Sequence, residues 1–382
     1  MKTHFDSKGA ALRRAENIQH YFKAGLKKIT EEERRANKDY SYVRDLPPAL
    51  IDRNIQQIIH ASPTLGNYFN LGADAPPMLD GEKYKVIAEV GSGRYGKVVL
   101  AEEDGTGEEV IIKVPLKRTT PQLLKAILTE YMYQELACIA LKHTVTVPEP
   151  LGIIRQQGDE HEGGYRYLVV SQFVPLLPGF YASFPIDYMI KNHNTKEFVR
   201  LIEWENICLN LIKAVEELYK NDLYHLDLHC GNVMIEIADN SIQPVIIDFG
   251  TAMRRDSRAG RRGSIFKAGG HTPEERKFLW PQIAPELYDS VIPLPTSDLY
   301  GVSSIIMFIA KAVKLPIVTR YINTFRDQEP ANRDMHDVFF EKIKQAFTEE
   351  RGSGVIVIDD DTEGERPTAR IEERGMYSGY TL

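Results

Sequence analysis

The side chains best suited to chemistry in this sequence are a lysine, two aspartates and an asparagine. Lys113 lies at the end of the apolar run EVIIKV, and a lysine buried at the end of a strand is costly unless it meets an anion. Asp227 precedes Asn232 by five residues, and Asp248 follows a pair of isoleucines. Carboxylate and amide oxygens on short loops suit a hard cation. These residue types therefore indicate sites for an anion and for a metal ion.

A glycine-rich segment, GSGRYGKV at residues 91–98, lies between two predicted strands. The side chains of residues 84–90 (YKVIAEV) follow an alternating pattern that predicts a strand, and residues 98–101 are typical of the returning strand. Glycines let the backbone approach a polyphosphate closely and point N–H groups at it. A dinucleotide-binding loop would be followed by a helix instead, so that function is disfavoured. An ordinary glycine-rich hairpin is the alternative.

Five short motifs follow one another in a fixed order that resembles the signature of the protein kinase superfamily. They are GSGRYGKV at 91–98, VIIK at 110–113, HLDLHCGN at 225–232, Asp248-Phe249-Gly250 and Ala284-Pro285-Glu286. The resemblance covers roughly residues 81–350. It implies transfer of the γ-phosphoryl group of ATP to a hydroxyl, with Mg²⁺. It also implies an α+β, bilobal fold with a β-rich small lobe (81–172) and a helical large lobe (175–350).

The resemblance assigns a role to each candidate residue. Lys113 would position the phosphates, Asp227 would orient the substrate hydroxyl, and Asn232 and Asp248 would bind Mg²⁺. With an asparagine and an aspartate so placed downstream, a zinc site across His225-Leu226-Asp227-Leu228-His229 is disfavoured. Ser171 would be the gatekeeper beside the adenine. ATP would contact Gly91, Ser92, Gly93, Gly96, Val98, Lys113 and the main chain of Gln172 and Val174.

Two glutamates compete for the role of holding Lys113. Thr120 as N-cap and a proline at the first helical position predict a helix over residues 121–142, which contains both of them. We choose Glu130 over Glu135 because its separation from Lys113 in the sequence is nearer to the usual spacing of the family. The other glutamate would then belong to a solvated face of the same helix.

Two positions depart from the family pattern. Leu226 stands where the family usually has an arginine that binds a phosphorylated activation loop, so we expect activity without loop phosphorylation. His229 stands where a lysine usually contacts the γ-phosphate, and a histidine is charged only in part near neutral pH. We count His229 among the catalytic residues.

The form HxDxHxxN also occurs in small-molecule kinases, which leaves the class of substrate open. The Ala-Pro-Glu motif at 284–286 favours a protein kinase over an aminoglycoside-type enzyme. The leading function is phosphorylation of serine or threonine in a protein. The alternatives are a small-molecule kinase of the aminoglycoside or sugar type, and a pseudokinase scaffold that acts through its flanks. The intact lysine, asparagine and pair of aspartates argue against the scaffold.

Two flanks lie outside the kinase resemblance. Residues 1–80 are predicted to form a helical extension, with an amphipathic helix over 8–29. Thr30 and Glu33 are typical of a capping box that opens a second helix. The extension would either pack on the small lobe or bind a partner, and we expect packing.

The acidic tail, residues 351–382, contains GSGVIVIDDDTEGE, which resembles a SUMO-interacting motif. Its β-branched residues would pair with an edge strand of SUMO, and the adjacent aspartates would meet basic residues at the rim. The alternatives are a C-terminal strand of the kinase domain itself or an unstructured tail. SUMO binding would place the protein in a eukaryotic cell, including as a viral or pathogen product. The residues concerned are Val355, Ile356, Val357 and Ile358.

Composition is typical of an intracellular enzyme in the cytoplasm or nucleus. The 382 residues are 43% hydrophobic and 26% charged, near globular averages. A net charge of −7 argues against a nucleic-acid-binding protein, which should be basic. Three cysteines without paired spacing fit a reducing compartment. No apolar run is long enough to predict a membrane span.

Overall fold

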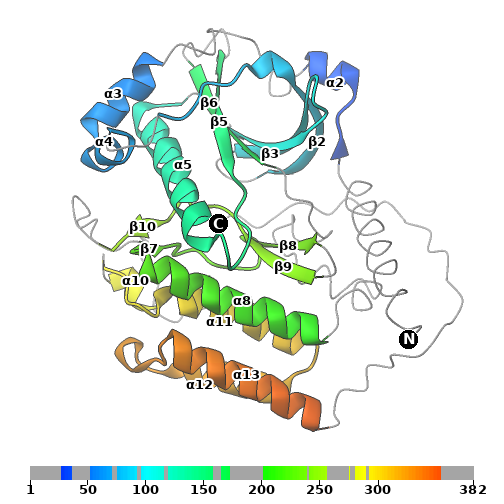
Figure 1. The fold of residues 1–382 in the computed structure, drawn as a ribbon, viewed down its shortest axis with the longest axis vertical. Coiled ribbons are helices and arrows are strands. Elements are labelled where there is room, and N and C mark those ends of the chain that lie inside the picture. The colour runs from blue at the N-terminus through cyan, green and yellow to red at the C-terminus, as the bar shows by residue number, and fades with distance from the viewer. Residues whose placement is uncertain are drawn as a thin grey trace, which may run out of the picture.

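The computed structural model describes residues 27–36, 52–70, 75–92, 96–115, 119–157, 165–172, 201–238, 241–255, 275, 280–289 and 292–353. In this part of the chain a β-sheet with its flanking helices lies at one end and a group of helices at the other (Figure 1). The predicted α+β fold with a β-rich small lobe and a helical large lobe is confirmed. The segment Val355–Ile358, with its predicted SUMO-binding role, lies outside the described residues.

The small-lobe sheet has six described strands, and every neighbouring pair is antiparallel. In β4 the even-numbered residues Val110, Ile112 and Val114 are buried in the small-lobe core, so Lys113 lies on the opposite face. The strands, in their order across the sheet, are β1 (Lys27–Lys28), β2 (Tyr84–Ser92), β3 (Gly96–Glu103), β4 (Glu109–Pro115), β6 (Tyr165–Gln172) and β5 (Pro150–Gln157).

One long helix, α5 (Pro121–Leu141), packs beside this sheet (Figure 1). Its start follows from local signals. The Thr120 side chain accepts a hydrogen bond from the Leu123 N–H at 3.2 Å, and Pro121 occupies a position that needs no N–H partner. The predicted helix over 121–142 is therefore confirmed.

Within residues 1–80, the described helices before β2 pack on the small lobe. Two short helices, α3 (Arg53–Ala61) and α4 (Pro63–Asn70), lie against α5 and share its apolar core (Figure 1). Ahead of them, Thr30 and Glu33 exchange two hydrogen bonds at the start of α2 (Glu31–Ala36), which confirms the capping box.

The predicted amphipathic helix over residues 8–29 is wrong at its C-terminal end. Lys27 and Lys28 form strand β1, which pairs with Glu89 and Ala88 of β2. Ile29 then becomes buried in the small-lobe core. Pairing with a distant strand overrides the helical period here. Residues 8–26 lie outside the described part.

The large lobe is built from a stack of helices with two short β-ribbons on its upper side (Figure 1). One apolar cluster runs through the long helices and continues into α5, so the two lobes share a core. The described helices of this lobe are α8 (Leu201–Lys220), α10 (Glu286–Asp289), α11 (Ser297–Ala312), α12 (Pro316–Asp327) and α13 (His336–Gly352). The ribbons pair β7 (Leu223–Tyr224) with β10 (Met253–Arg254) and β8 (Val233–Ala238) with β9 (Ser241–Ile246). Two short 3₁₀ turns cover Gly81–Lys83 and Pro330–Asn332.

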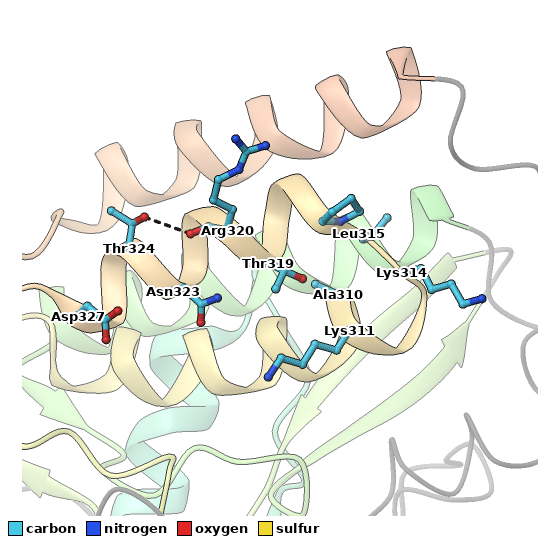
Figure 2. A pocket seen from close by; sticks show the side chains of 10 residues that line it. Ala310, Lys311, Lys314, Leu315, Thr319, Arg320, Asn323, Thr324 and Asp327 are labelled. Atoms are coloured by element: carbon cyan, nitrogen blue, oxygen red, sulfur yellow. Dashed lines mark hydrogen bonds between the residues drawn. The ribbon is translucent and has the colours of Figure 1, made fainter. Parts of the chain in front are cut away.

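An open groove of about 640 Å³ lies between α11 and α12 (Figure 2). Lys311 and Lys314 contribute to one wall and Arg320 to the other. None of the predicted site residues lines this groove, so it is separate from the proposed chemistry. In the described part of the chain, no helix combines the length and the apolar character that crossing a bilayer requires.

Gly301 of α11 packs directly against the backbone of the loop at Leu228, and this contact can be tested by mutation. A Cβ on Gly301 would lie 2.8 Å from the carbonyl oxygen of Leu228, closer than the two atoms can approach. Gly301→Ala should therefore destabilise the protein by about 1–3 kcal/mol through overpacking, although alanine is the better helix former. Urea unfolding measures this.

Gly352→Ala is the matched control, because Gly352 is also helical and nothing lies within 4 Å of its added Cβ. It should be neutral or stabilising. Equal stability of the Gly301 variant and the wild type would show that α11 does not press on this loop.

Candidate active site

Lys113 projects from the face of β4 that is turned away from the small-lobe core. It lies opposite Val98 of β3 and Val169 of β6, and residues paired across antiparallel strands share a face. Val98, predicted to contact ATP, therefore shares the face from which the lysine projects.

Two carboxylates from distant segments meet the Lys113 ammonium. Its Nζ contacts Oε1 of Glu130 on α5 and lies 3.5 Å from Oδ1 of Asp248, which follows β9. Glu135 instead bonds to Tyr68 on the other side of the helix. The structure therefore brings Lys113, Glu130 and Asp248 together and leaves Glu135 out.

The charges of this cluster set its protonation. Burial by itself lowers the pKa of Lys113, but the negative charges of Asp248 and Glu130 outweigh it and raise the pKa above its ordinary value. The Lys113 charge in turn holds the pKa of Asp248 below its usual range. Burial raises the pKa of Glu130, and the lysine opposes that shift. Lys113 is therefore a permanent cation beside an ionised Asp248.

Asp248 is held by an unusual local backbone. Its φ is 65°, in the left-handed region, and its Oδ1 accepts a hydrogen bond from the Gly250 N–H at 3.3 Å. A Cβ on Gly250 would lie 3.1 Å from that same oxygen, so glycine leaves the carboxylate its room. Phe249 between them is fully buried and packs on the His225 ring at 4.8 Å. The buried Phe249 side chain thus fixes the backbone that carries the Asp248 carboxylate.

His225 is a structural histidine that orders the loop around Asp227. Its ring is completely buried, and its Nε2 lies 3.0 Å from the Ile247 carbonyl oxygen, which can only accept. Its Nδ1 accepts from the Asp227 N–H at 3.3 Å, so the proton must be on Nε2. Burial lowers the pKa of His225 to about 4, which keeps the ring neutral. Both nitrogens are occupied, which removes His225 from any zinc site.

Asp298, in the first turn of α11, anchors the backbone of the same loop. The Asp298 carboxylate is buried in the first turn of α11 and accepts from the N–H groups of His225 at 2.8 Å and Leu226 at 2.7 Å. Burial raises the pKa of Asp298 to about 6, although the two N–H groups act against that shift. Leu226 has a φ of 67°, so these bonds hold a backbone conformation that L-residues disfavour.

Asp227 faces the site with two polar neighbours. His229 Nε2 lies 3.8 Å from its Oδ1, while His229 Nδ1 accepts from the Gly231 N–H at 2.9 Å. Gln282, two residues before Ala284, forms a side-chain hydrogen bond to Asp227. Burial raises the pKa of Asp227, and the charge of His229 and the Gln282 bond oppose this shift. An acceptor with this surrounding is suited to binding a hydroxyl proton.

Two hydrogen bonds hold Asn232 in place and leave its side-chain Oδ1 available as an acceptor. Its side-chain Nδ2 donates to the Asp227 carbonyl at 2.9 Å, and its backbone carbonyl accepts from the Ile247 N–H at 3.0 Å. The side-chain Oδ1 is then the acceptor left for a cation, with the Asp248 carboxylate as a second oxygen ligand. The donor set therefore fits Mg²⁺ better than a softer metal.

The described ends of the glycine-rich segment belong to β2 and β3, and β3 is paired with the strand that carries Lys113. Gly91 and Ser92 end β2 and Gly96 begins β3, whereas Gly93 lies outside the described residues. A Cβ on Gly96 would lie 2.5 Å from the Val114 carbonyl, so packing on β4 already requires this glycine. On the other side, Gln172 ends β6, and Val174 lies outside the described part. Ser171 Oγ receives a long hydrogen bond of 3.4 Å from Gln134 of α5.

Sequence reasoning missed two residues that shape the site. Gln282 lies far from Asp227 in the chain, and only its place just before the Ala-Pro-Glu motif hinted at a role. His225 entered the prediction only within the HLDLHCGN motif and as a disfavoured zinc ligand, although its place within an apolar stretch was a signal for burial.

The arrangement can bind a polyanion together with a metal ion. Lys113 and Asp248 keep 37% and 47% of their side-chain surface exposed, so both remain open to a ligand. Asn232 and Asp248 would supply the oxygen ligands, and Asp227 would supply an acceptor for a proton.

Comparison with known proteins agrees with this chemistry. Residues 84–309, more than half of the chain, match the family model for the protein kinase domain. The serine/threonine-protein kinase prpf4B of Dictyostelium discoideum is 25% identical over 171 residues, or 45% of this chain. That alignment covers 19% of the relative, so the chain spans only a small part of its length.

Asp298 offers a direct test of how the loop is held. Asp298→Asn replaces one acceptor oxygen by an N–H group, which must face a backbone N–H. We expect a loss of about 1–3 kcal/mol in unfolding free energy, the cost of an unsatisfied buried group.

The control is Asp337→Asn, which removes the same charge from the first turn of α13, where the side chain is exposed. It should cost only the helix-dipole contribution, about 0.3–1 kcal/mol. Denaturant unfolding that ranks the two variants equally would contradict the anchoring role.

Proposed function

The chain belongs to the protein kinase family, and on this premise we propose that it phosphorylates serine or threonine in a protein substrate, using ATP and Mg²⁺. The observation that carries the proposal is the meeting of Lys113, Glu130 and Asp248. These residues come from a strand, a helix and a loop that are distant in the sequence. A phosphoryl-transfer site needs such a set, because catalysis is mostly positioning and charge stabilisation.

Each residue has a task in this proposal. Lys113 binds phosphate oxygens and Glu130 holds Lys113 in place. Asn232 Oδ1 and Asp248 would hold Mg²⁺, which neutralises charge on the phosphates when bound. Asp227 accepts or orients the proton of the attacking hydroxyl, with Gln282 and His229 beside its carboxylate.

A protein substrate is supported by the Ala-Pro-Glu segment. Glu286 forms a salt bridge at 3.0 Å with the fully buried Arg333 and accepts from Ser297 Oγ at 2.8 Å. This anchors the segment next to Gln282 and Asp227 on the large lobe, where an extended peptide would lie. The relative from Dictyostelium discoideum is a serine/threonine-protein kinase, which supports serine and threonine as acceptors.

A small-molecule kinase is the second candidate, and His229 is the observation that favours it. The histidine stands where a lysine is usual, and its Nδ1 is occupied by Gly231. Transfer to sugars or aminoglycosides, with none to peptides, would decide for this candidate.

Activity without phosphorylation of the activation segment is part of the proposal. Leu226 is buried in an apolar cluster with Tyr224, Met253 and Leu287. A packed leucine offers no charge to a phosphate at this point. Binding of SUMO at residues 355–358 and an intracellular location stay predictions from the sequence.

The two aspartates should separate chemistry from binding. Asp227→Asn should lower the rate of phosphoryl transfer by about 10²–10⁴-fold, because it removes the proton acceptor, while Mg·ATP still raises the melting temperature. Asp248→Asn should lose both transfer and the Mg·ATP-dependent rise. Radiolabel transfer to a mixed peptide library and thermal-shift assays measure these effects. Wild-type transfer rates in either folded variant would refute the assigned roles.

Dephosphorylated protein should be as active as the purified protein. Treatment with a broad-specificity phosphatase, checked by mass spectrometry and followed by removal of the phosphatase, should leave the initial rate unchanged. A large loss of rate that returns after incubation with ATP would show that a phosphorylated loop is required.

A further inference from the structure

The two glutamates of α5 face in different directions and serve different partners. They are five residues apart, which at about 100° per residue places them about 140° apart around the helix. Glu130 reaches Lys113 in the site, whereas Glu135 Oε2 accepts a hydrogen bond from the Tyr68 hydroxyl of α4 at 3.1 Å. Burial, and next the charge of Glu135, raise the pKa of Tyr68, so the phenol stays a donor.

Apolar contacts join α3 and α4 to the same side of α5. Ile55, Ile59, Leu65 and Phe69 are at most 7% exposed, and they belong to the core cluster that contains Leu124, Ile127 and Leu128 of α5. Figure 1 shows the two short helices alongside the first half of α5. The pair therefore covers the face of α5 that is turned away from Lys113.

The pair is also tied to the sheet. Asp52 is 2% exposed and caps α3 through the N–H groups of Asn54 and Ile55. Its second oxygen lies 3.1 Å from Arg155 of β5, and its first accepts from the Tyr167 hydroxyl of β6 at 3.0 Å. Segment 52–70 thus contacts the sheet at one end and α5 at the other.

We propose that segment 52–70 is a positioning module that holds α5 where Glu130 can pair with Lys113, with Tyr68 as its positioning residue. The inference deepens the proposed function and rests on it, because the pair matters only if Lys113 binds phosphates. The lysine–glutamate pair requires the sheet and α5 to keep one relative placement. A bridge from β5 and β6 to the far side of α5 restricts that placement without any partner protein.

A double-mutant cycle tests the proposal. Tyr68→Phe removes one hydroxyl and keeps the ring. We expect kcat to fall about fivefold, which is within the range of effects seen for residues that influence a site without contacting its ligand. In a Glu130→Gln background, which already lacks the ion pair, Tyr68→Phe should give no further loss. A role in stability alone would instead lower the melting temperature and leave kcat unchanged.

Tyr321→Phe is the matched control, because the Tyr321 hydroxyl also donates to a carboxylate, that of Asp334 at 2.7 Å, but within the large lobe. It should lower the melting temperature without changing kcat. An unchanged kcat in the Tyr68 variant, or an equal loss in both backgrounds, overturns the proposal.

Hydrogen exchange separates a failure of the module from a failure of the proposed function. Tyr68→Phe should speed exchange of the amides of α5 in the protein without nucleotide, and Tyr321→Phe should not. This readout needs no phosphoryl transfer. If the wild type transfers no phosphate, the proposed function fails, and α5 exchange unchanged by Tyr68→Phe would overturn the module as well.

Discussion

The structure depends on one shared cation. Lys113 of β4 lies between the carboxylates of Glu130 and Asp248, which belong to different parts of the fold. Taking a charged lysine out of water is costly unless it is paired, and each carboxylate without the ammonium would be an unpaired charge in a partly buried site. The ammonium therefore sets where the sheet, α5 and the loop after β9 must meet. That meeting place, once formed, is a site for a charged ligand.

Each lobe has contacts that hold its part of the Lys113, Glu130 and Asp248 cluster in position. In the large lobe, Asp298 of α11 holds the backbone at His225 and Leu226, and Gly301 lets the same loop rest directly on the helix. α11 can serve as this platform because it is buried on most of its surface. In the small lobe, segment 52–70 covers the outer face of α5. Packing behind the site thus leaves Lys113 and Asp248 partly exposed to a ligand at its front.

Local chemistry made much of the fold predictable, and long-range contacts account for the rest. Thr120 and Pro121 predict the start of α5, and the alternation of side chains along residues 84–90 predicts β2, because these signals act within a few residues. Strand β1 has no such signal, since two lysines become a strand only by pairing with β2. The choice of Glu130 over Glu135 came from family spacing; the structure shows its cause, which is the direction each residue faces around α5. The bond from Gln282 to Asp227 joins distant segments that no local pattern connects.

The most direct test is to ask which lysine lies beside the phosphates of bound nucleotide. An acyl-phosphate derivative of ATP transfers its acyl group to a lysine amine near the phosphates, and mass spectrometry identifies the modified residue. The account predicts modification of Lys113, suppressed by excess Mg·ATP. Modification of other lysines with Lys113 untouched, in protein that binds the probe, would contradict it.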